Sequence, residues 1–249
     1  GHTTMLLGAA RYLAETRNFD GTVHFIFQPA EEGGGGGARM VREGLFDRFP
    51  CDEIYALHNW PLLPFGTIGV RPGPIMAATD TFDIKITGRG GHAAIPHKTI
   101  DPVVVAAQLV TALQTLISRS TNPMDSAVLS VTRIQAGSAY NVIPDDAALY
   151  GTVRTFLPET RSEMEAGMQR VCAGIAAAFG CTVKFDYQRG YPPTVNHEIE
   201  AEIAAGVAGE IVGEENVRRD VEPSMGGEDF SYMLEKRPGA YLFVGQGGG

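Results

Sequence analysis

Two adjacent glutamates, Glu31 and Glu32, stand at the start of a glycine run in "FIFQPAEEGGGGGARM", residues 25–40. The pair has three interpretations. A flexible loop with two solvated carboxylates is the commonest origin of such a pair. A phosphate-binding loop is excluded, because the G-x-x-x-x-G-K-[ST] pattern is absent and two carboxylates would repel phosphate. The third is a metal or acid–base site at the carboxyl end of a strand, where open α/β sheets bind their ligands.

The third interpretation gives the two carboxylates separate tasks. Neighbouring residues of an extended chain point in different directions, so one carboxylate could bind a metal while the other faces a substrate. Glycines 33–37 permit close backbone approach and positive φ angles. His58 ends the next apolar pattern, "EIYALHNW", and is expected at the same sheet edge. A lone histidine there is more often structural, but carboxylate and imidazole together are ordinary ligands of zinc or manganese.

Composition narrows the classes of protein. The 249 residues are 44% hydrophobic, which is enough to bury one large core or two smaller ones. A formal net charge of -9 argues against a nucleic-acid or anionic-membrane partner, because phosphate binding needs a basic face. No apolar run approaches the ~20 residues that span a bilayer. The three cysteines are odd in number and lack metal-ligand spacing, so they indicate reduced thiols and a cytoplasmic protein.

The two ends of the chain have one kind of pattern, in which apolar strands alternate with helices. Uninterrupted apolar strands separated by helices indicate a parallel-rich sheet covered by helices. The expected helices are 3–16, 38–46 and 197–213, and the expected strands are 22–27, 53–60, 66–72 and 241–245. We expect these segments to form an α/β domain from residues 1–80 and 190–249.

The middle of the chain has a different pattern. The strand at 81–88 alternates, with Phe82, Ile84 and Ile86 on one face, as in a sheet buried on one side. Asp101 and Pro102 form a good N-cap pair for the helix that follows. The other expected elements are strands 127–134, 148–156 and 181–187 and a helix through Met164 and Met168. The helix that starts at Pro102 is expected to have an apolar face formed by Val103, Ala106, Ala107, Val110, Leu113 and Ile117. This β-α-β-β-α-β order predicts an inserted ferredoxin-like domain over residues 81–189.

The motifs resemble, in order, those of the hippurate hydrolase and indole-acetyl-amino-acid amidohydrolase group, which is related to glutamate-releasing carboxypeptidases. They are "FQPAEEGGGGGARMVREGLF", "LHNWP", "GTIGVRPGPIMAATD", "GRGGHAAIPH", "IDPVVVAAQ", "AYNVIPD", "GTVRTF", "RGYPPTVN" and "MGGEDFSYML". The resemblance implies a catalytic domain with two divalent metal ions per site. Zinc or manganese is most expected, with cobalt or nickel as alternatives. It also implies that the inserted domain is a lid that mediates homodimerisation.

The resemblance implies roles for three residues of the catalytic domain. Glu31 matches the general base, and Glu32 and His58 match metal ligands. In such a site two cations hold a bridging water, lower its pKa and polarise the amide carbonyl. Glu31 would take the proton of this water and return it to the leaving nitrogen.

Three residues of the inserted domain match substrate-contacting positions. His92 matches a histidine that donates to the substrate's carbonyl oxygen, and Asn141 matches a residue that helps to hold the substrate. Arg154 matches the arginine that pairs with the substrate's carboxylate, although its position on a strand is also compatible with a solvent-facing side chain. Glu228 and Asp229 lie in a family motif, but we expect helix-start carboxylates there rather than ligands.

The predicted function is metal-dependent hydrolysis of an N-acyl or N-aroyl amino acid, a small molecule, to a carboxylic acid and a free amino acid. Members of the group carry a Cys-x-His segment before the position where this chain begins, and a histidine ligand after its end. Both ends therefore look cut, and we expect the chain alone to hydrolyse such substrates slowly or not at all. The alternative is a catalytically inactive, dimeric binding or regulatory fragment of the same fold. Serine hydrolase chemistry lacks support, since no G-x-S-x-G elbow is present.

Overall fold

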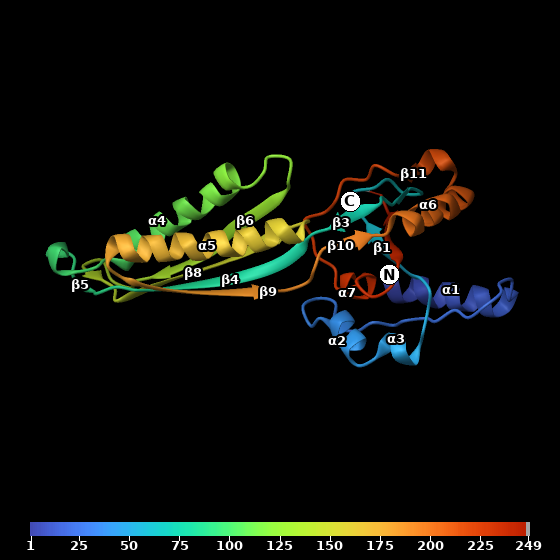
Figure 1. Cartoon of the computed structure of the whole chain (residues 1–249), viewed down its shortest axis with the longest axis horizontal. Coiled ribbons are helices and arrows are strands. Elements are labelled where there is room, and N and C mark those ends of the chain that lie inside the picture. Colours follow the sequence, from blue (N-terminus) through green and yellow to red (C-terminus); the bar gives the residue numbers. More distant parts are fainter. Residues whose placement is uncertain (248–249) are drawn as a thin grey trace. The chain divides into compact units, whose positions relative to one another are not determined.

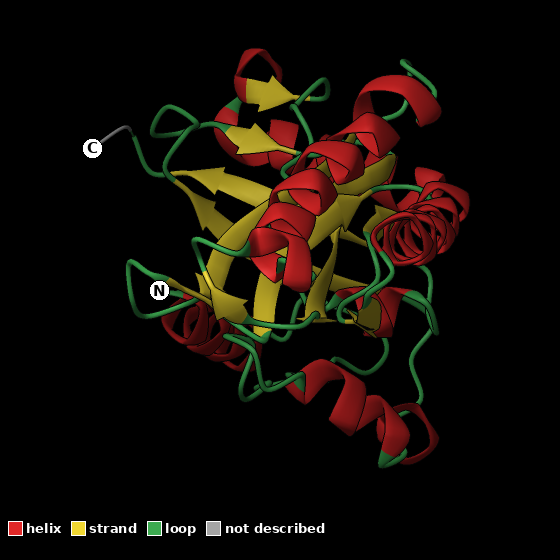
Figure 2. Cartoon of the chain, turned by 90° about the vertical axis from the view of Figure 1, so that its left-hand side faces the viewer, coloured by secondary structure: helices red, strands yellow, loops and turns green. Residues whose placement is uncertain are grey.

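A computed structural model describes residues 1–247. The chain contains both helices and strands (Figure 2) and forms two compact units. Unit 1 comprises Gly1–Ala77 and the segment from Tyr191 onward, and unit 2 comprises Ala78–Gly190. Unit 2 thus begins three residues before the expected residue 81 and ends one residue after the expected residue 189.

Unit 1 is built around a mixed four-stranded sheet in the order β1-β12-β2-β11. β1 and β12 run parallel along seven residue pairs, β2 is antiparallel to β12, and β11 is parallel to β2. A second ribbon pairs β3 with β10. The elements of this unit are α1 (His2–Thr16), α2 (Gly36–Arg42), α3 (Leu45–Arg48), β1 (Ile54–Trp60), β2 (Ile68–Gly69), β3 (Gly73–Met76), β10 (Thr194–Asn196), α6 (Glu198–Val212), η3 (Glu214–Asn216), β11 (Val217–Arg218), α7 (Ser231–Leu234) and β12 (Gly239–Gly245).

The core of unit 1 lies on both sides of strand β12. On one side Phe243 is fully buried, and its ring stacks on that of Trp60 with 4.0 Å between centroids and an interplanar angle of 9°. On the other side Leu242 packs with buried alanines of α6, whose small side chains let the helix lie close to the sheet. The central strand is therefore covered on both faces, as its uninterrupted apolar sequence predicts.

The predicted strand at residues 22–27 is wrong. These residues form no regular element, and Val23 and Phe27 are 43% and 48% exposed. A strand requires a neighbour for its N–H and C=O groups, and no described strand pairs with this segment. Glu31 and Glu32 consequently follow an irregular segment, not a sheet strand. The single helix expected over 38–46 is also wrong: it divides into α2 and α3 at Gly44, whose φ is 85°.

Unit 2 is an antiparallel sheet in the order β6-β8-β4-β9. Helices α4 and α5 lie along one face of it (Figure 1). The elements of this unit are β4 (Ala78–Thr87), β5 (Gly91–His92), η1 (Pro96–Lys98), α4 (Pro102–Thr115), the π-helical turn η2 (Leu116–Ser120), β6 (Ala127–Ala136), β7 (Val142–Ile143), β8 (Asp146–Thr155), α5 (Pro158–Phe179) and β9 (Thr182–Arg189). The long elements follow a strand–helix–strand–strand–helix–strand order, while a role as lid or dimerisation domain stays a prediction.

The local predictions for unit 2 are confirmed at β4 and at the start of α4. Phe82, Ile84 and Ile86 are fully buried, and the Asp101 carboxylate accepts a hydrogen bond from the Val103 amide at 2.8 Å. The predicted stripe on α4 is confirmed at Ala106 and Leu113, which are buried, but Val103 is 45% exposed and the stripe also includes the buried Val105 and Leu109. A helix that is apolar almost all round does not mark a unique buried face.

The same apolarity makes Pro102–Ser120 long and apolar enough to cross a membrane by length and composition alone. Helices that pack in a soluble core pass the same test. Leu109 and Leu113 of this segment are fully buried against the sheet of unit 2. Because 28% of the segment is buried within the structure, packing on the sheet accounts for part of its apolar sequence.

Candidate functional site

The loop that carries Glu31 and Glu32 is a tight turn. The Gly34 amide donates to the Ala30 carbonyl at 3.0 Å, and Ala30 itself has a φ of 57°. A non-glycine residue in this left-handed region is uncommon, and such residues cluster at functional sites. A Cβ on Gly36 would lie 1.7 Å from the Pro29 carbonyl oxygen. The glycine run is therefore required where the chain packs against itself.

Glu31 lies among three other carboxylates. Burial, together with the charges of Glu228, Glu32 and Asp229, raises the pKa of the Glu31 carboxyl to about 7. The backbone carbonyl of Glu31 accepts a hydrogen bond from the Tyr191 hydroxyl at 2.6 Å, which fixes the turn in unit 1. The site is thus a concentration of negative charge, in which a proton or a cation is stabilised.

Glu228, one of these carboxylates, is buried. Its carboxylate accepts hydrogen bonds from the Tyr241 hydroxyl and from the Phe230 amide, the latter at 3.2 Å. Burial raises the pKa of the Tyr241 phenol, so the phenol stays protonated and remains a donor. Because Glu228 bonds to an amide just before α7, its expected position at a helix start agrees with the structure.

Asp229 is fully buried beside Glu228. Asp229 precedes α7 in the sequence, but its carboxylate bonds to the first turn of α2. Its carboxylate accepts from the Gly37 amide at 2.8 Å and from the side-chain amide of Gln28. The sequence patterns did not predict that the charges of Glu228 and Asp229 act on Glu31. The one hint in the sequence is that these two residues are, like Glu31 and Glu32, an adjacent acidic pair.

His58 lies on β1, within the same unit. Its Nδ1 is 2.7 Å from the Asn59 carbonyl oxygen, so this nitrogen carries the proton and Nε2 is left as the basic atom. The ring of His2 lies 4.3 Å from that of His58, between centroids, and His2 Nε2 accepts from the Asn59 amide at 3.4 Å. His2, which was not among the predicted site residues, therefore lies beside His58.

The donors of this unit fit a divalent cation in their chemistry. Imidazole nitrogens and carboxylate oxygens are suitable ligands, and the charges around Glu31 favour a cation. Their geometry does not complete a site: within residues 1–247, no three His, Cys, Asp or Glu side chains form a group that could hold a metal ion. Unit 1 thus provides donors but not a full ligand set.

The structure brings together two of the predicted residues of unit 2. His92 on β5 pairs with Val142 on β7, and the Ala93 amide donates to the Asn141 carbonyl at 3.0 Å. His92 Nδ1 accepts from the Ala94 amide at 3.1 Å, so in the neutral ring Nε2 carries the hydrogen. An exposed His92 can therefore donate from Nε2 to an external acceptor.

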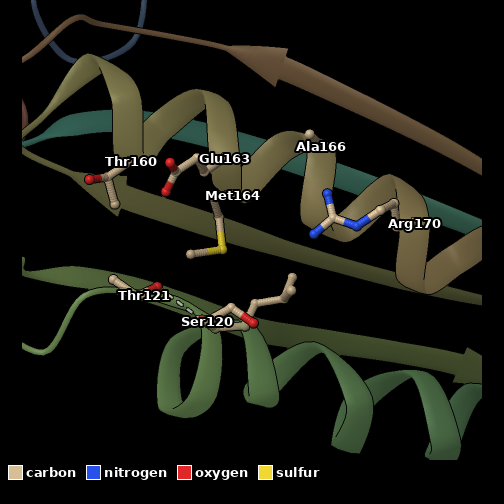
Figure 3. A pocket seen from close by; sticks show the side chains of 8 residues that line it. Ser120, Thr121, Thr160, Glu163, Met164, Ala166 and Arg170 are labelled. Atoms are coloured by element: carbon tan, nitrogen blue, oxygen red, sulfur yellow. Dashed lines mark hydrogen bonds between the residues drawn. The ribbon is translucent and has the colours of Figure 1, made fainter.

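Arg154 lies on another strand, β8. Its guanidinium is half-buried and donates to the Thr152 hydroxyl and, at 3.0 Å, to the Val153 carbonyl. Unit 2 also contains a cavity of about 300 Å³ between η2 and α5 (Figure 3). It is lined by Leu116, Ser120, Thr121, Thr160, Glu163, Met164, Ala166 and Arg170. None of the predicted site residues lines this cavity.

Comparison with known proteins assigns a family to this geometry. The profile of the peptidase family M20/M25/M40 matches residues 1–249. The chain belongs to this family. It is 42% identical over 248 residues to N-acetylcysteine deacetylase of Bacillus subtilis, covering 99% of this chain and 64% of that protein. It is 40% identical over 244 residues to hippurate hydrolase of Campylobacter jejuni, covering 98% and 63%.

Solved structures agree with this assignment. A dinuclear metal-binding M20 peptidase from Bacillus subtilis has a TM-score of 0.81 at 38% identity, over 98% of this chain and 62% of that one. A putative aminohydrolase from Staphylococcus aureus has a TM-score of 0.86 at 31% identity, over 96% and 61%. The resemblance expected from the motifs is confirmed, and the chain spans less than two thirds of each of these relatives.

Proposed function

We propose that the site built around Glu31 hydrolyses the amide bond of N-acyl or N-aroyl amino acids. The observation that carries this proposal is that burial and the charges of Glu228, Glu32 and Asp229 raise the pKa of Glu31 to about 7 in an M20-family chain. The names of the similar proteins, a deacetylase of N-acetylcysteine and a hippurate hydrolase, support the substrate class. Hippurate-like substrates are one member of it.

The proposed chemistry uses Glu31 as the general base. Its carboxylate takes the proton of the attacking water and returns it to the leaving nitrogen, which is a standard role for a carboxyl with a pKa near neutrality. We propose Glu32 and His58 as donors toward divalent metal ions, by analogy with the dinuclear relative. From the second unit, His92 would donate to the carbonyl oxygen, Asn141 would hold the substrate and Arg154 would pair with its carboxylate.

A second candidate is a non-catalytic binding protein of the same fold. One observation favours it: the described residues do not bring three metal donors together. For both candidates we propose a homodimer formed through unit 2 and a cytoplasmic location. Light scattering coupled to size-exclusion chromatography measures the molar mass and so tests the homodimer.

The two candidates differ in turnover and in metal content. The hydrolase proposal expects release of glycine from hippurate or of cysteine from N-acetylcysteine that requires added zinc, manganese, cobalt or nickel and is lost in Glu31→Gln. The binding-protein proposal expects no release with any of these metals. It also expects less than one tightly bound metal ion per chain, as measured by elemental analysis after dialysis. Metal-independent release that persists in Glu31→Gln would contradict both.

A further inference from the structure

We propose that Asp229 is the positioning residue that holds the Glu31–Glu32 turn in its conformation. The inference rests on the proposed function only in taking Glu31 as the general base. Asp229 is remote in sequence, yet its two carboxylate oxygens bond to the two sides of the turn. One oxygen accepts from Gln28, three residues before Glu31, and the other accepts from Gly37, five residues after Glu32. Asp229 thereby joins the two ends of the segment, while Tyr191 holds its middle through the Glu31 carbonyl.

Burial makes this arrangement specific. Asp229 has no exposed surface, so its carboxylate depends on these protein donors rather than on water. The Gly37 amide belongs to the first turn of α2, which has no intrahelical partner for it, so the carboxylate also satisfies that donor. A Cβ at Gly37 would lie 2.5 Å from the Asp229 backbone carbonyl oxygen, so the two segments meet at backbone distance. The close packing of Asp229 on Gly37 therefore requires a glycine at position 37.

The contact explains how the turn tolerates its conformation. Ala30 has a positive φ, and the turn's own bonds are few, chiefly those from Gly33 to Glu31 and from Gly34 to Ala30. A conformation with local strain persists when the surrounding structure over-determines it. Asp229 supplies that constraint from outside the turn at its two ends, and the Tyr191 hydroxyl supplies it at Glu31. Its action on Glu31 is therefore indirect, through the backbone.

Hydrogen–deuterium exchange of the full chain tests this role. Asp229→Ala removes both hydrogen bonds and is expected to speed exchange of the amides of residues 30–37 by about tenfold or more. Asp229→Asn keeps both bonds, because its oxygen accepts from Gly37 and its amide donates to a rotated Gln28 side chain. Asn is therefore expected to restore protection to within about twofold of the parent chain.

Two further variants make the test specific. Leu242→Ala truncates a buried core residue on the α6 side of unit 1 and is expected to leave the exchange of residues 30–37 relative to the rest of the unit unchanged. Gln28→Ala removes one of the two bonds and is expected to speed the same amides by a smaller factor than Asp229→Ala. If Asp229→Ala does not fold, Gln28→Ala and Asp229→Asn carry the comparison.

Three results would overturn the proposal. They are unchanged protection of residues 30–37 in Asp229→Ala, exchange in Asp229→Asn as fast as in Asp229→Ala, and no effect of Gln28→Ala. The second would show that the charge of Asp229 acts, rather than its hydrogen bonds. Because exchange is read without substrate, absence of amide hydrolysis in the parent chain would refute the proposed function and leave this result intact.

Discussion

Asp80, at the start of β4, is 1% exposed and is the acceptor of a buried network in unit 2. Its carboxylate accepts two hydrogen bonds from the Arg161 guanidinium, one from the Tyr187 hydroxyl at 2.7 Å and one from the Gly190 amide at 3.0 Å. The partners come from α5, from β9 and from the residue that follows β9. Asp80→Ala therefore removes the carboxylate that joins three segments and leaves the Arg161 charge buried without it.

The expected loss is large for one side chain. Removing one partner of a buried ion pair costs about 3–5 kcal/mol, because the remaining charge stays out of water. Loss of the neutral bonds from Tyr187 and Gly190 would add about 1 kcal/mol each if they found no water. We expect Asp80→Ala to lower the free energy of unfolding of unit 2 by about 3–5 kcal/mol. The double variant Asp80→Leu/Arg161→Met, which removes both charges, should lose markedly less.

The two units can be followed separately. Trp60 is the only tryptophan and lies in unit 1, so its fluorescence reports unfolding of that unit in urea. Hydrogen exchange of the β4 and β8 amides at increasing urea reports on unit 2. A loss below about 1 kcal/mol in Asp80→Ala would refute the reasoning, because that is the range of an exposed ion pair. The reasoning would also be refuted if the double variant lost as much unfolding free energy as the sum of the losses in the single variants Asp80→Leu and Arg161→Met.

Three shorter predictions concern other positions. Gly36→Ala places a Cβ 1.7 Å from the Pro29 carbonyl oxygen and should displace the Glu31 turn, seen as faster exchange of residues 30–37. Its control, Gly206→Ala in α6, meets no atom within 4 Å and should stabilise unit 1 by about 0.5–1 kcal/mol in urea unfolding. Burial raises the pKa of the Cys172 thiol to about 11, so its alkylation rate should be low at pH 8, rise with pH toward that value and increase on unfolding. Reaction of native Cys172 as fast as in urea would contradict this.

The parts of the fold that could be predicted from sequence are those with local signals. Alternation fixed the face of β4 that carries Phe82 and Ile84, and the Asp101–Pro102 pair marked the start of α4. Both effects involve residues a few positions apart. The pairing of β1 with β12 joins segments at opposite ends of the chain, and apolar composition identified each strand without identifying its partner. Residues 22–27 have the same composition but no described partner, so composition alone gave the wrong element.

The site divides in the same way. Glu31, Glu32 and His58 were candidates because of residue type and neighbouring pattern. Asp229 was interpreted only through its own segment, because its hydrogen bond to Gly37 spans 192 residues and no periodicity reports such a contact. His2 was missed as a neighbour of His58 for the same reason. Tertiary contacts of buried charges are therefore the part of this site that a single sequence does not contain.

The central claim is that Glu31 is the base of an amide hydrolase. Its most direct test is amino-acid release from hippurate and from N-acetylcysteine by the full chain at high protein concentration, with each divalent metal, for the parent and Glu31→Gln. The account predicts metal-dependent release that falls by about 100-fold or more in Glu31→Gln, the range expected for loss of a general base, with the fold of unit 1 unchanged by Trp60 fluorescence. Equal release by the two proteins would contradict it.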